Sequence, residues 1–334
     1  MKRIPSWILF GALFFFGYKA QAAAHLEVSG KTLLFNEKPL ILRGVSVGDP
    51  FLARAGRPLT DYQTIAKEWK ANVIRLDIHP SVWKTIPHHQ VIATLQANVE
   101  AALQNGMFVV IDWHCIGFPD GFYEKTPYSD DPKDLYDSDF TLAKDFWEEV
   151  SKKFGDNGRV LFELWCEPVF KENEPSTSQK WPELKPYLMQ LTKIIRRHGK
   201  NVVLATGNCW AYRLTGIRQD PLPGKNVAYS WHIYAGHDEN DEAAWAYALD
   251  DLETVAPVIV TEWGFQRHTH EHFKGSPESF GKKFVRDFLE AKQLHSIAWC
   301  WHPEWTPVML QKDWKTPTEM GRFVKNYLIA HAPN

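Results

Sequence analysis

The sequence predicts a (β/α)8 TIM barrel, in which eight parallel strands alternate with helices and close into a cylinder. Eight short apolar segments recur along the chain, and a longer segment with helical periodicity follows almost every one. No Gly-rich phosphate loop follows the first strand, which disfavours an open doubly wound sheet. The 334 residues show no linker, so we expect a single domain over residues 23–334.

Residues 1–22 are predicted to be a signal peptide rather than part of the fold. Lys2 and Arg3 precede an uncharged apolar run, Trp7–Tyr18, and Ala20-Gln21-Ala22 matches a cleavage site, so we expect cleavage after Ala22. The run is shorter than the ~20 residues of a membrane span, which makes a membrane anchor the weaker alternative. The mature protein is therefore expected to be secreted or periplasmic and to have no membrane contact.

The predicted elements follow one another in a regular order. A short β-hairpin within His25–Pro39 is expected to cap the bottom of the barrel. Barrel strands are expected at Leu40–Val45, Asn72–Asp77, Met107–Trp113, Val160–Trp165, Val202–Thr206, Val227–Trp231, Val258–Glu262 and Ser296–Trp301. Helices are expected at Asp61–Lys70, His89–Asn105, Phe140–Phe154, Pro182–Arg197, Glu242–Thr254, Pro277–Gln293 and Thr318–Ile329, with only a weak one at Trp210–Ile217.

Two of these strands end on a glutamate. One apolar run leads to Glu167, and Pro168 then stops the strand because proline cannot extend a sheet ladder. The run Val258–Gly264 carries Glu262 near its end. An ionisable group at the end of a buried strand is costly unless it is paired or used, and a barrel places its chemistry at these strand ends. Two such acids are what glycoside hydrolysis requires.

Other polar and aromatic groups gather at the same C-terminal strand ends. They are Arg75, Asp77, Trp113, His114, Cys166, Asn208, Cys209, Trp210, His232, Tyr234, Trp263, Trp299, Trp301 and Trp305. The opposite ends carry mostly Gly, Asn and Lys, whereas groups that serve only folding would be scattered over both ends. The 15 tryptophans are either core residues or stacking surfaces for sugar rings, and their positions must decide between the two.

These strand-end motifs together resemble glycoside hydrolase family 5, a retaining β-glycanase family with many cellulases and mannanases. The resemblance runs from about Leu40 to Trp314. It rests on Leu42-Arg43-Gly44-Val45, Arg75, Trp113-His114, Glu167-Pro168, His232-Ile233-Tyr234, Thr261-Glu262-Trp263-Gly264, Trp301 and Lys312-Asp313-Trp314, which occur in the order expected for the family.

The resemblance implies a double displacement with Glu262 as nucleophile and Glu167 as acid and base. Arg75 and Tyr234 would keep Glu262 ionised, and His114 and His232 would bind sugar hydroxyls or orient the acids. The expected substrate-binding residues are Arg75, Trp113, His114, Cys166, Trp210, His232, Tyr234, Trp263, Trp301 and Trp305. This chemistry needs no metal or cofactor, and we expect a monomer.

Cys166 departs from the family pattern, which has Asn before the acid. In the family this Asn hydrogen-bonds the sugar 2-hydroxyl at the subsite of cleavage, whereas a thiol is a weak donor and a weak acceptor. Three interpretations remain open: a small packing residue, an altered substrate subsite, or a disulfide. The pairing of Cys115, Cys166, Cys209 and Cys300 cannot be assigned from their spacing.

Two further acids and a histidine-rich loop are singled out by position. Glu163 is expected to point into the barrel and to pair with Arg75, because it precedes Glu167 by four residues. Asp112 is expected to face the helices. The run His268, His270 and His272 is expected to be a solvated loop, with a metal site as the alternative.

The sequence thus predicts an exported, retaining, cellulase-like endo-β-1,4-glycanase that acts on a β-linked polysaccharide or oligosaccharide. A β-mannanase or an exo-acting β-glycosidase is the alternative within the enzyme class. A catalytically weak carbohydrate-binding barrel and a metal hydrolase that uses the histidine loop are alternatives outside it. The net charge of −2 gives no electrostatic basis for nucleic-acid binding.

Overall fold

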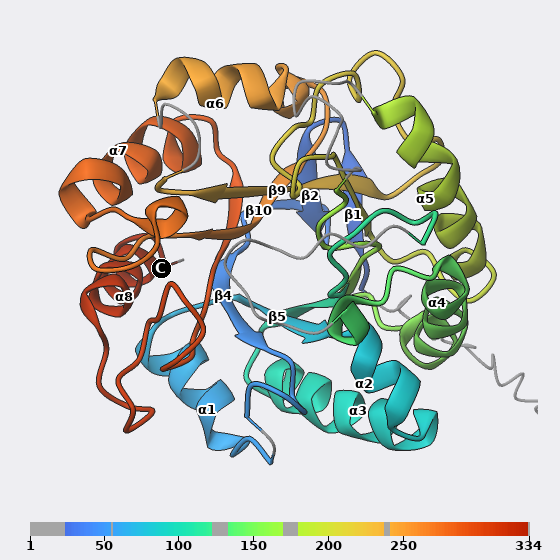
Figure 1. The fold of residues 1–334 in the computed structure, drawn as a ribbon, viewed down its shortest axis with the longest axis horizontal. Coiled ribbons are helices and arrows are strands. Elements are labelled where there is room, and N and C mark those ends of the chain that lie inside the picture. Colours follow the sequence, from blue (N-terminus) through green and yellow to red (C-terminus); the bar gives the residue numbers. More distant parts are fainter. Residues whose placement is uncertain (1–23, 55, 122–132, 170–179, 237–240, 333–334) are drawn as a thin grey trace, which may run out of the picture.

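The protein forms a closed barrel of eight parallel strands, as predicted (Figure 1). The structure is a computed structural model that describes residues 24–54, 56–121, 133–169, 180–236 and 241–332, so the expected signal peptide lies outside the described residues. The barrel strands are β4 (Arg43–Gly48), β5 (Val73–Ile78), β6 (Phe108–Trp113), β7 (Val160–Glu163), β8 (Val203–Thr206), β9 (Val227–Tyr234), β10 (Val258–Gly264) and β11 (His295–Ala298). They follow in chain order around the barrel, and β11 pairs with β4 to close it.

Helices surround this barrel in the ribbon view (Figure 1). They are α1 (Thr60–Gln63) continued by a π-helical segment (Thr64–Glu68), α2 (Pro80–Thr85), α3 (His88–Gln104), α4 (Phe140–Phe154), α5 (Trp181–Ile195), α6 (Glu242–Leu249), α7 (Lys282–Phe284) between two π-helical segments (Pro277–Gly281 and Val285–Glu290), and α8 (Glu319–Ala330). Three short 3-10 segments cover Lys133–Tyr136, Leu252–Thr254 and Glu271–Phe273. The helix α2 was not predicted. In the described part of the chain, no helix is both long and apolar enough to cross a membrane.

The predicted weak helix at Trp210–Ile217 does not form. Cys209, Trp210 and Ala211 all adopt positive φ values, between 54° and 58°. A right-handed helix requires negative φ, so these three residues turn the chain instead. The turn brings Asn208 and Arg213 together in an isolated antiparallel bridge.

The N-terminal cap is a sheet of three strands rather than the predicted two-stranded hairpin. Its strands are β1 (Leu26–Ser29), β2 (Thr32–Phe35) and β3 (Lys38–Leu40), joined in that order. The Leu26 N–H donates to Gly158, just before β7, and the Val28 N–H donates to Asn226, just before β9. The sheet therefore covers the N-terminal end of the barrel, as predicted. The third strand ends at Leu40, the residue expected to begin the first barrel strand, and that strand starts at Arg43 instead.

The inside of the barrel is divided into two layers along the strands. Near the N-terminal sheet it is apolar, and its buried side chains include Leu42, Val73, Val110, Leu161, Leu204, Ile259 and Ile297. Toward the C-terminal strand ends it contains buried charged groups, among them Arg75, Asp77, Asp112 and Glu163. Charged groups become buried only where partners compensate them, so the second layer marks the candidate site.

Candidate active site

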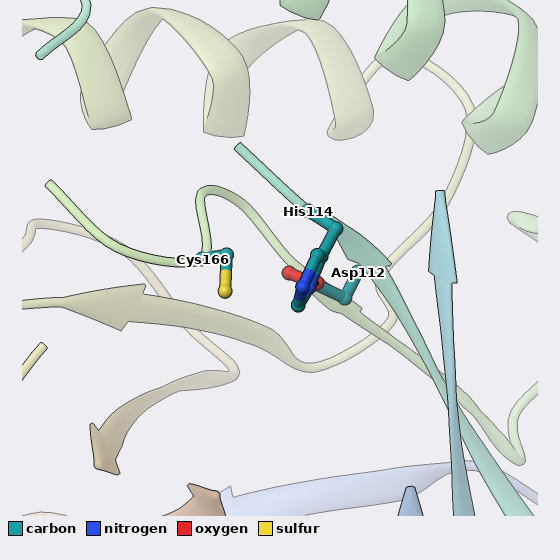
Figure 2. A group of neighbouring side chains, drawn as sticks. All are labelled: Asp112, His114 and Cys166. Atoms are coloured by element: carbon teal, nitrogen blue, oxygen red, sulfur yellow. The ribbon is translucent and has the colours of Figure 1, made fainter. Parts of the chain in front are cut away.

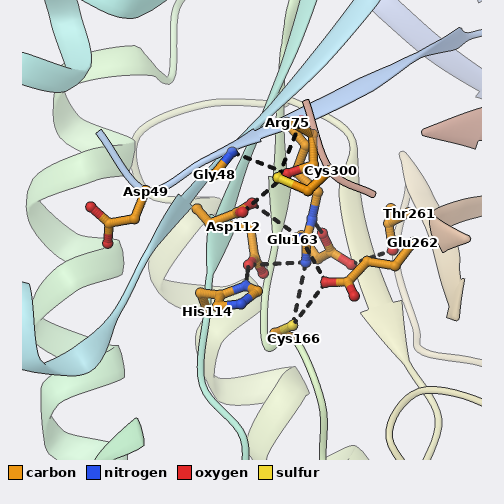
Figure 3. A network of polar contacts seen from close by, with 12 residues as sticks. Gly48, Asp49, Arg75, Asp112, His114, Glu163, Cys166, Thr261, Glu262 and Cys300 are labelled. Atoms are coloured by element: carbon orange, nitrogen blue, oxygen red, sulfur yellow. Dashed lines mark hydrogen bonds and ion pairs between the residues drawn. The ribbon is translucent and has the colours of Figure 1, made fainter. Parts of the chain in front are cut away.

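A single arginine on β5 holds four carboxylates together. The buried guanidinium of Arg75 lies 2.6 Å from Glu163, 2.9 Å from Glu262, 3.0 Å from Asp112 and 3.1 Å from Asp77 (Figure 3). Burial opposes the charge, but the attraction of the surrounding acids holds the pKa of Arg75 well above its usual value. The predicted pairing of Glu163 with Arg75 is confirmed.

The two acids at the strand ends face the same imidazole nitrogen. His232 Nδ1 lies 2.9 Å from Glu167 Oε1 and 3.7 Å from Glu262 Oε2. These carboxylate oxygens are therefore no farther apart than the sum of the two distances, and a bent angle at Nδ1 brings them closer. Retaining glycosidases hold their carboxyl groups about 5–5.5 Å apart, and inverting ones about 6.5–9.5 Å. The geometry thus suits the retaining arrangement better.

Glu262, on β10, is held through both of its carboxylate oxygens. Arg75 donates to Oε1 at 2.9 Å, and the Tyr234 hydroxyl donates to Oε2 at 2.5 Å. Burial, and then the charge of Glu262, raises the pKa of Tyr234 well above its usual value, so the hydroxyl keeps its proton. Two fixed donors orient the carboxylate, which is what a nucleophile requires.

Glu167 follows β7 and lies in a different electrostatic environment. Burial raises the pKa of its carboxyl group and the charge of Glu262 adds to this effect, while the hydrogen bond with His232 opposes it. The net effect is a raised pKa, which suits a general acid. The backbone of Glu167 is fixed on both sides, because its N–H donates to Cys115 and its carbonyl accepts from Gly117, both at 3.0 Å.

Cys166 belongs to the same cluster. Its sulfur accepts a hydrogen bond from Arg75 at 3.3 Å, and its thiol lies 3.7 Å from Glu262 Oε1. Burial raises the pKa of the thiol well above its usual value, so the group stays neutral. All four cysteines are among the described residues and none of them forms a disulfide. The thiol therefore lies against the candidate nucleophile.

Asp112 points into the barrel, so the prediction that it faces the helices was wrong. Its Oδ2 lies 3.0 Å from the Arg75 guanidinium and 2.8 Å from His114 Nδ1 (Figure 3). Side chains alternate along β6, so Asp112 and His114 share the inner side of the barrel while Trp113 takes the outer one. Burial, and then the neighbouring His79 and Arg75, lowers the pKa of His114. The resulting neutral imidazole suits a hydrogen bond with a sugar hydroxyl.

Two groups of side chains in this region have the atoms and spacing that a metal ion needs. Among the described residues, they are Asp112, His114 and Cys166, and Cys166, His232 and Glu262 (Figure 2). Arg75 already forms an ion pair with Asp112 and donates hydrogen bonds to Cys166 and Glu262. A metal ion bound by these atoms would lie against the guanidinium and be repelled by it, so we assign no metal site here.

Comparison with models of protein families identifies the family of the chain. The family model for cellulase, glycosyl hydrolase family 5, matches residues 34–304. The chain belongs to glycosyl hydrolase family 5. Its match covers the barrel and both acids, and it confirms the family that the strand-end motifs predicted.

Family 5 relatives and solved structures agree with this assignment. The chain is 26% identical over 283 residues to the cellulase CelDZ1 of Thermoanaerobacterium sp, covering 82% of this chain and 69% of that protein. It is 28% identical to an endoglucanase A of Evansella cellulosilytica, over 70% of this chain but only 43% of the relative. A crystal structure of a β-glucanase from Saccharophagus degradans in complex with cellotetraose superposes with a TM-score of 0.83 at 24% identity, covering 94% of this chain and 95% of that one. This last likeness shows the shared fold.

Three tryptophans predicted to bind substrate lie away from the family 5 acids. Trp113, Trp263 and Trp301 are each at most 2% exposed and belong to the core between barrel and helices. Their rings pack against Phe146 at 4.8 Å, Phe284 at 5.8 Å and Trp69 at 6.2 Å, respectively. A register shift between Val260 and Glu262 lets both Thr261 and Glu262 face the inside of the barrel. Trp263, which follows Glu262, lies on the outer side. The structure does not bring these three rings to the site.

Trp299, just after β11, is the aromatic residue that the sequence-based site omitted. Its ring is parallel to that of His114, with centroids 5.4 Å apart, and nearly parallel to that of Trp305 at 5.9 Å. The signal was present, because Ile297 belongs to the apolar layer inside the barrel and Trp299 follows it by two residues. The resemblance instead assigned the family tryptophan to Trp301.

The predicted residues Trp305 and Trp210 belong to different clusters of side chains. Trp305 contacts Trp299 and also lies over Gly48, where a Cβ would come within 2.9 Å of its ring. Trp210 is half-buried, and its backbone N–H donates to the Pro168 carbonyl, next to Glu167. Both residues are therefore partly exposed close to residues of the candidate site.

A buried Asp–His pair, also missed, extends the site beyond His114. His79 Nδ1 lies 2.9 Å from Asp49 Oδ2, and the His79 ring lies 4.6 Å from that of His114. Asp49 also accepts the backbone N–H groups of Phe51 and His79. Sequence spacing gave no indication of this pair, because Asp49 and His79 follow different strands.

The histidine-rich loop is not among the potential metal groups of the described residues. His268 and His270 are exposed, as expected of a solvated loop. His272 is half-buried, and its ring lies 5.5 Å from that of Tyr234. One end of this loop therefore reaches the rim of the site.

Proposed function

We propose that the protein is a retaining glycoside hydrolase that cleaves β-1,4 bonds of a β-glucan, with the action of an endoglucanase. The observation that carries this proposal is the contact of one nitrogen, His232 Nδ1, with both Glu167 and Glu262. That contact supports the short carboxyl separation on which a double displacement depends. The names of the relatives, cellulase and endoglucanase, support the substrate class.

In the first step, Glu262 attacks the anomeric carbon of the bound sugar. The bond to the glycosidic oxygen breaks, and Glu167 transfers its proton to that oxygen as the alcohol leaves. Arg75 and Tyr234 hold the attacking carboxylate in place, as their hydrogen bonds to Glu262 suggest. The product is a glycosyl ester of Glu262.

In the second step, water replaces the ester. Glu167, now ionised, accepts a proton from the water molecule while the water oxygen attacks the anomeric carbon. The bond to Glu262 breaks and the carboxylate is restored. The sugar retains its anomeric configuration because two inversions have taken place.

The aromatic rings around the acids support binding of several sugar units. Trp299 lies beside His114 and in one cluster with Tyr234, which bonds Glu262, and we propose that it contacts the sugar that is attacked. Trp210 lies beside the strand end of Glu167, which protonates the leaving group, and we propose that it contacts the leaving part of the chain. Such amphipathic rings stack on the apolar faces of sugars.

We further propose that the enzyme is exported and acts as a monomer. The basic end, apolar run and cleavage motif of residues 1–22 support export. Size-exclusion chromatography and N-terminal sequencing of the mature protein test these two statements. An N-terminus other than residue 23, or a stable dimer, would contradict them.

The proposed function is tested by release of reducing ends from cellulose, mixed-linkage glucan, mannan and xylan. We expect the wild type to cleave a β-1,4-glucan and Glu262→Gln to lose at least ~10⁴-fold in activity, because the amide cannot act as nucleophile. NMR of the first product should show the retained anomer. Preferred cleavage of mannan would instead favour the mannanase alternative, and glycan binding without cleavage by either protein would favour a binding barrel.

A further inference from the structure

His232 lies between the two candidate catalytic acids, and both of its ring nitrogens face oxygen atoms. Nδ1 faces Glu167 Oε1 at 2.9 Å and Glu262 Oε2 at 3.7 Å. Nε2 faces Thr261 Oγ1 at 3.0 Å, on the opposite edge of the ring. A neutral imidazole carries one proton and can donate to only one of these edges.

The Thr261 hydroxyl is already committed as a donor. It donates to Glu163 Oε1 at 2.7 Å, and Glu163 also accepts from Arg75 at 2.6 Å. Burial raises the pKa of Glu163, but the charge of Arg75 and the hydrogen bond with His232 outweigh it and bring the pKa to about 2. Glu163 is therefore an acceptor only. With its single proton used, Thr261 must accept from Nε2, so Nε2 carries a proton.

The charges around His232 come from four neighbouring strands. The strand β7 contributes Glu163 and leads to Glu167, while β10 contributes Glu262. Arg75 on β5 acts against a positive charge on the ring, whereas His114, after β6, is neutral. On β9 itself, the Tyr234 hydroxyl is bonded to Glu262. Negative groups surround the ring more closely than positive ones. The pKa of His232, which burial would lower, is accordingly raised to about 10 by Glu262 and the other acids.

We propose that Thr261, oriented by Glu163, is a positioning residue that keeps His232 doubly protonated between the two catalytic acids. The imidazolium then serves as counter-ion for each acid in turn. This inference rests on the proposed double displacement and adds to it a role for three residues, none of which exchanges a covalent bond with the sugar.

The counter-ion changes partner as the negative charge moves. In the free enzyme Glu262 is ionised and Glu167 carries the acid proton. After the first step Glu262 is an uncharged ester, and Glu167 has given its proton to the leaving oxygen and is ionised. His232 keeps both ring protons throughout, so atoms and charge balance without it. A cation held beside both acids lowers the cost of each ionised state.

Substitution of Thr261 by valine tests this role, with serine as the matched control. Thr261→Val preserves the branched shape but removes the acceptor for Nε2, whereas Thr261→Ser keeps the hydroxyl. In ¹⁵N-histidine NMR, assigned with His232→Asn, we expect both ring nitrogens of His232 to be protonated at pH 7 in the wild type. We expect the pKa of His232 to fall by about one to two units in Thr261→Val and to stay unchanged in Thr261→Ser.

Kinetics provide a second readout that a merely structural role would not change. The basic limb of the pH profile of kcat/KM reports loss of a proton from the coupled His232–Glu167 pair. We expect this limb to move to lower pH in Thr261→Val by the same shift that NMR measures, while the acidic limb stays in place. An aryl glycoside with an activated leaving group needs no acid, so its kcat/KM should change little.

Two results would overturn the inference. One is a neutral His232 at pH 7 in the wild type, which requires no variant to detect. The other is an unchanged His232 titration and basic limb in Thr261→Val. Failure of the wild type to cleave any β-glucan would instead overturn the proposed function, and the NMR titration would still decide the role of Thr261.

Discussion

Two of the buried histidines, His232 in the polar layer and His295 in the apolar layer, have opposite pKa shifts. His232, in the polar layer, has its pKa raised to about 10 because Glu262 and the other acids outweigh burial. His295, in the apolar layer, has its pKa lowered to about 3 by burial, with Arg43 adding to the effect. Its Nδ1 accepts the Leu42 N–H at 3.1 Å, which requires an unprotonated nitrogen. Equally buried imidazoles are thus neutral at His295 and positively charged at His232, because Glu163, Glu167 and Glu262 face His232 directly.

The largest effect is expected from removing the cation of the polar layer. Arg75→Met would leave four buried carboxylates without their common partner. We expect a loss of stability of about 3–5 kcal/mol, and a loss of activity of at least ~10³-fold because Glu262 loses a donor. Thermal unfolding and polysaccharide assays measure both. Arg75→Lys keeps the positive charge but not the forked guanidinium, so its stability and activity should lie between those of the wild type and Arg75→Met. Wild-type activity in Arg75→Met would refute the role of the arginine.

A substitution in the apolar layer should lower stability without lowering the activity of the folded molecules. Leu161→Ala opens a cavity in this layer, and we expect it to cost about 2–5 kcal/mol of unfolding free energy. The activity per folded molecule should stay within about twofold of the wild type, because no contact with the acids is lost. Denaturant titration and activity at matched folded fractions provide the test. A selective loss of catalysis would mean that the two layers are coupled.

The two histidines predict two different pH ranges of instability. His295 has a lowered pKa, so the unfolded chain binds a proton that the folded one does not, and stability falls as pH decreases from about 6.5 to about 3. His232 has a raised pKa, so its contribution is present below about 6.5 and is lost as pH rises toward about 10. Each slope can reach ~1.4 kcal/mol per pH unit.

Denaturant titrations that compare His295→Gln with the wild type measure how much of the stability lost at acidic pH is due to His295. The glutamine oxygen can accept the Leu42 N–H without titrating, so the variant should lose less stability between pH 6.5 and pH 4. Parallel curves for the two proteins would show that His295 does not titrate differently in the folded state.

The two classes of tryptophan should separate binding from packing. Trp299→Ala removes a ring beside His114, and we expect KM for oligosaccharides to rise about tenfold, with a smaller loss of stability than Trp301→Ala because Trp299 is the less buried ring. Trp301→Ala opens the core and should cost about 3–5 kcal/mol while leaving KM nearly unchanged. Kinetics on cellotetraose together with thermal unfolding test the pair. The opposite pattern would restore Trp301 as the sugar-binding ring.

The smallest effect is expected at Cys166. Cys166→Asn introduces a side chain that can both donate and accept, and we expect kcat/KM on a glucan to rise several-fold if the sugar 2-hydroxyl lies there. Cys166→Ala serves as the control, since it removes the weak thiol contacts with Arg75 and Glu262 and adds none. Equal rates for the asparagine and alanine variants would identify the thiol as a packing residue.

The fold and the two acids could be predicted because their signals are local. Apolar strands and amphipathic helices are periodic, and Glu167 and Glu262 are the carboxylates that end two buried strands. The pairing of Glu163 with Arg75 followed from alternation alone. In each case a pattern a few residues long was sufficient.

The errors arose where the phase of a strand or its exact end mattered. The prediction placed Trp113 and His114 together at the site and Asp112 outside, although neighbouring residues of a regular strand point to opposite faces. It also preferred Trp301 to Trp299. The Asp49–His79 pair depends on a tertiary contact, and the turn at Cys209 depends on positive φ values. The periodicity of the sequence predicts neither feature.

The position of the N-terminal sheet determines which end of the barrel would face a support to which the enzyme is attached. It lies at the closed end of the barrel, bound to Gly158 and Asn226. At the other terminus, α8 contacts the same end, because Tyr327 bonds Glu290 and lies near Arg43 at the start of β4. A tether, a fused module or a solid support joined through either terminus would therefore leave the acids facing outward, so the enzyme should stay accessible to an insoluble fibre when immobilised.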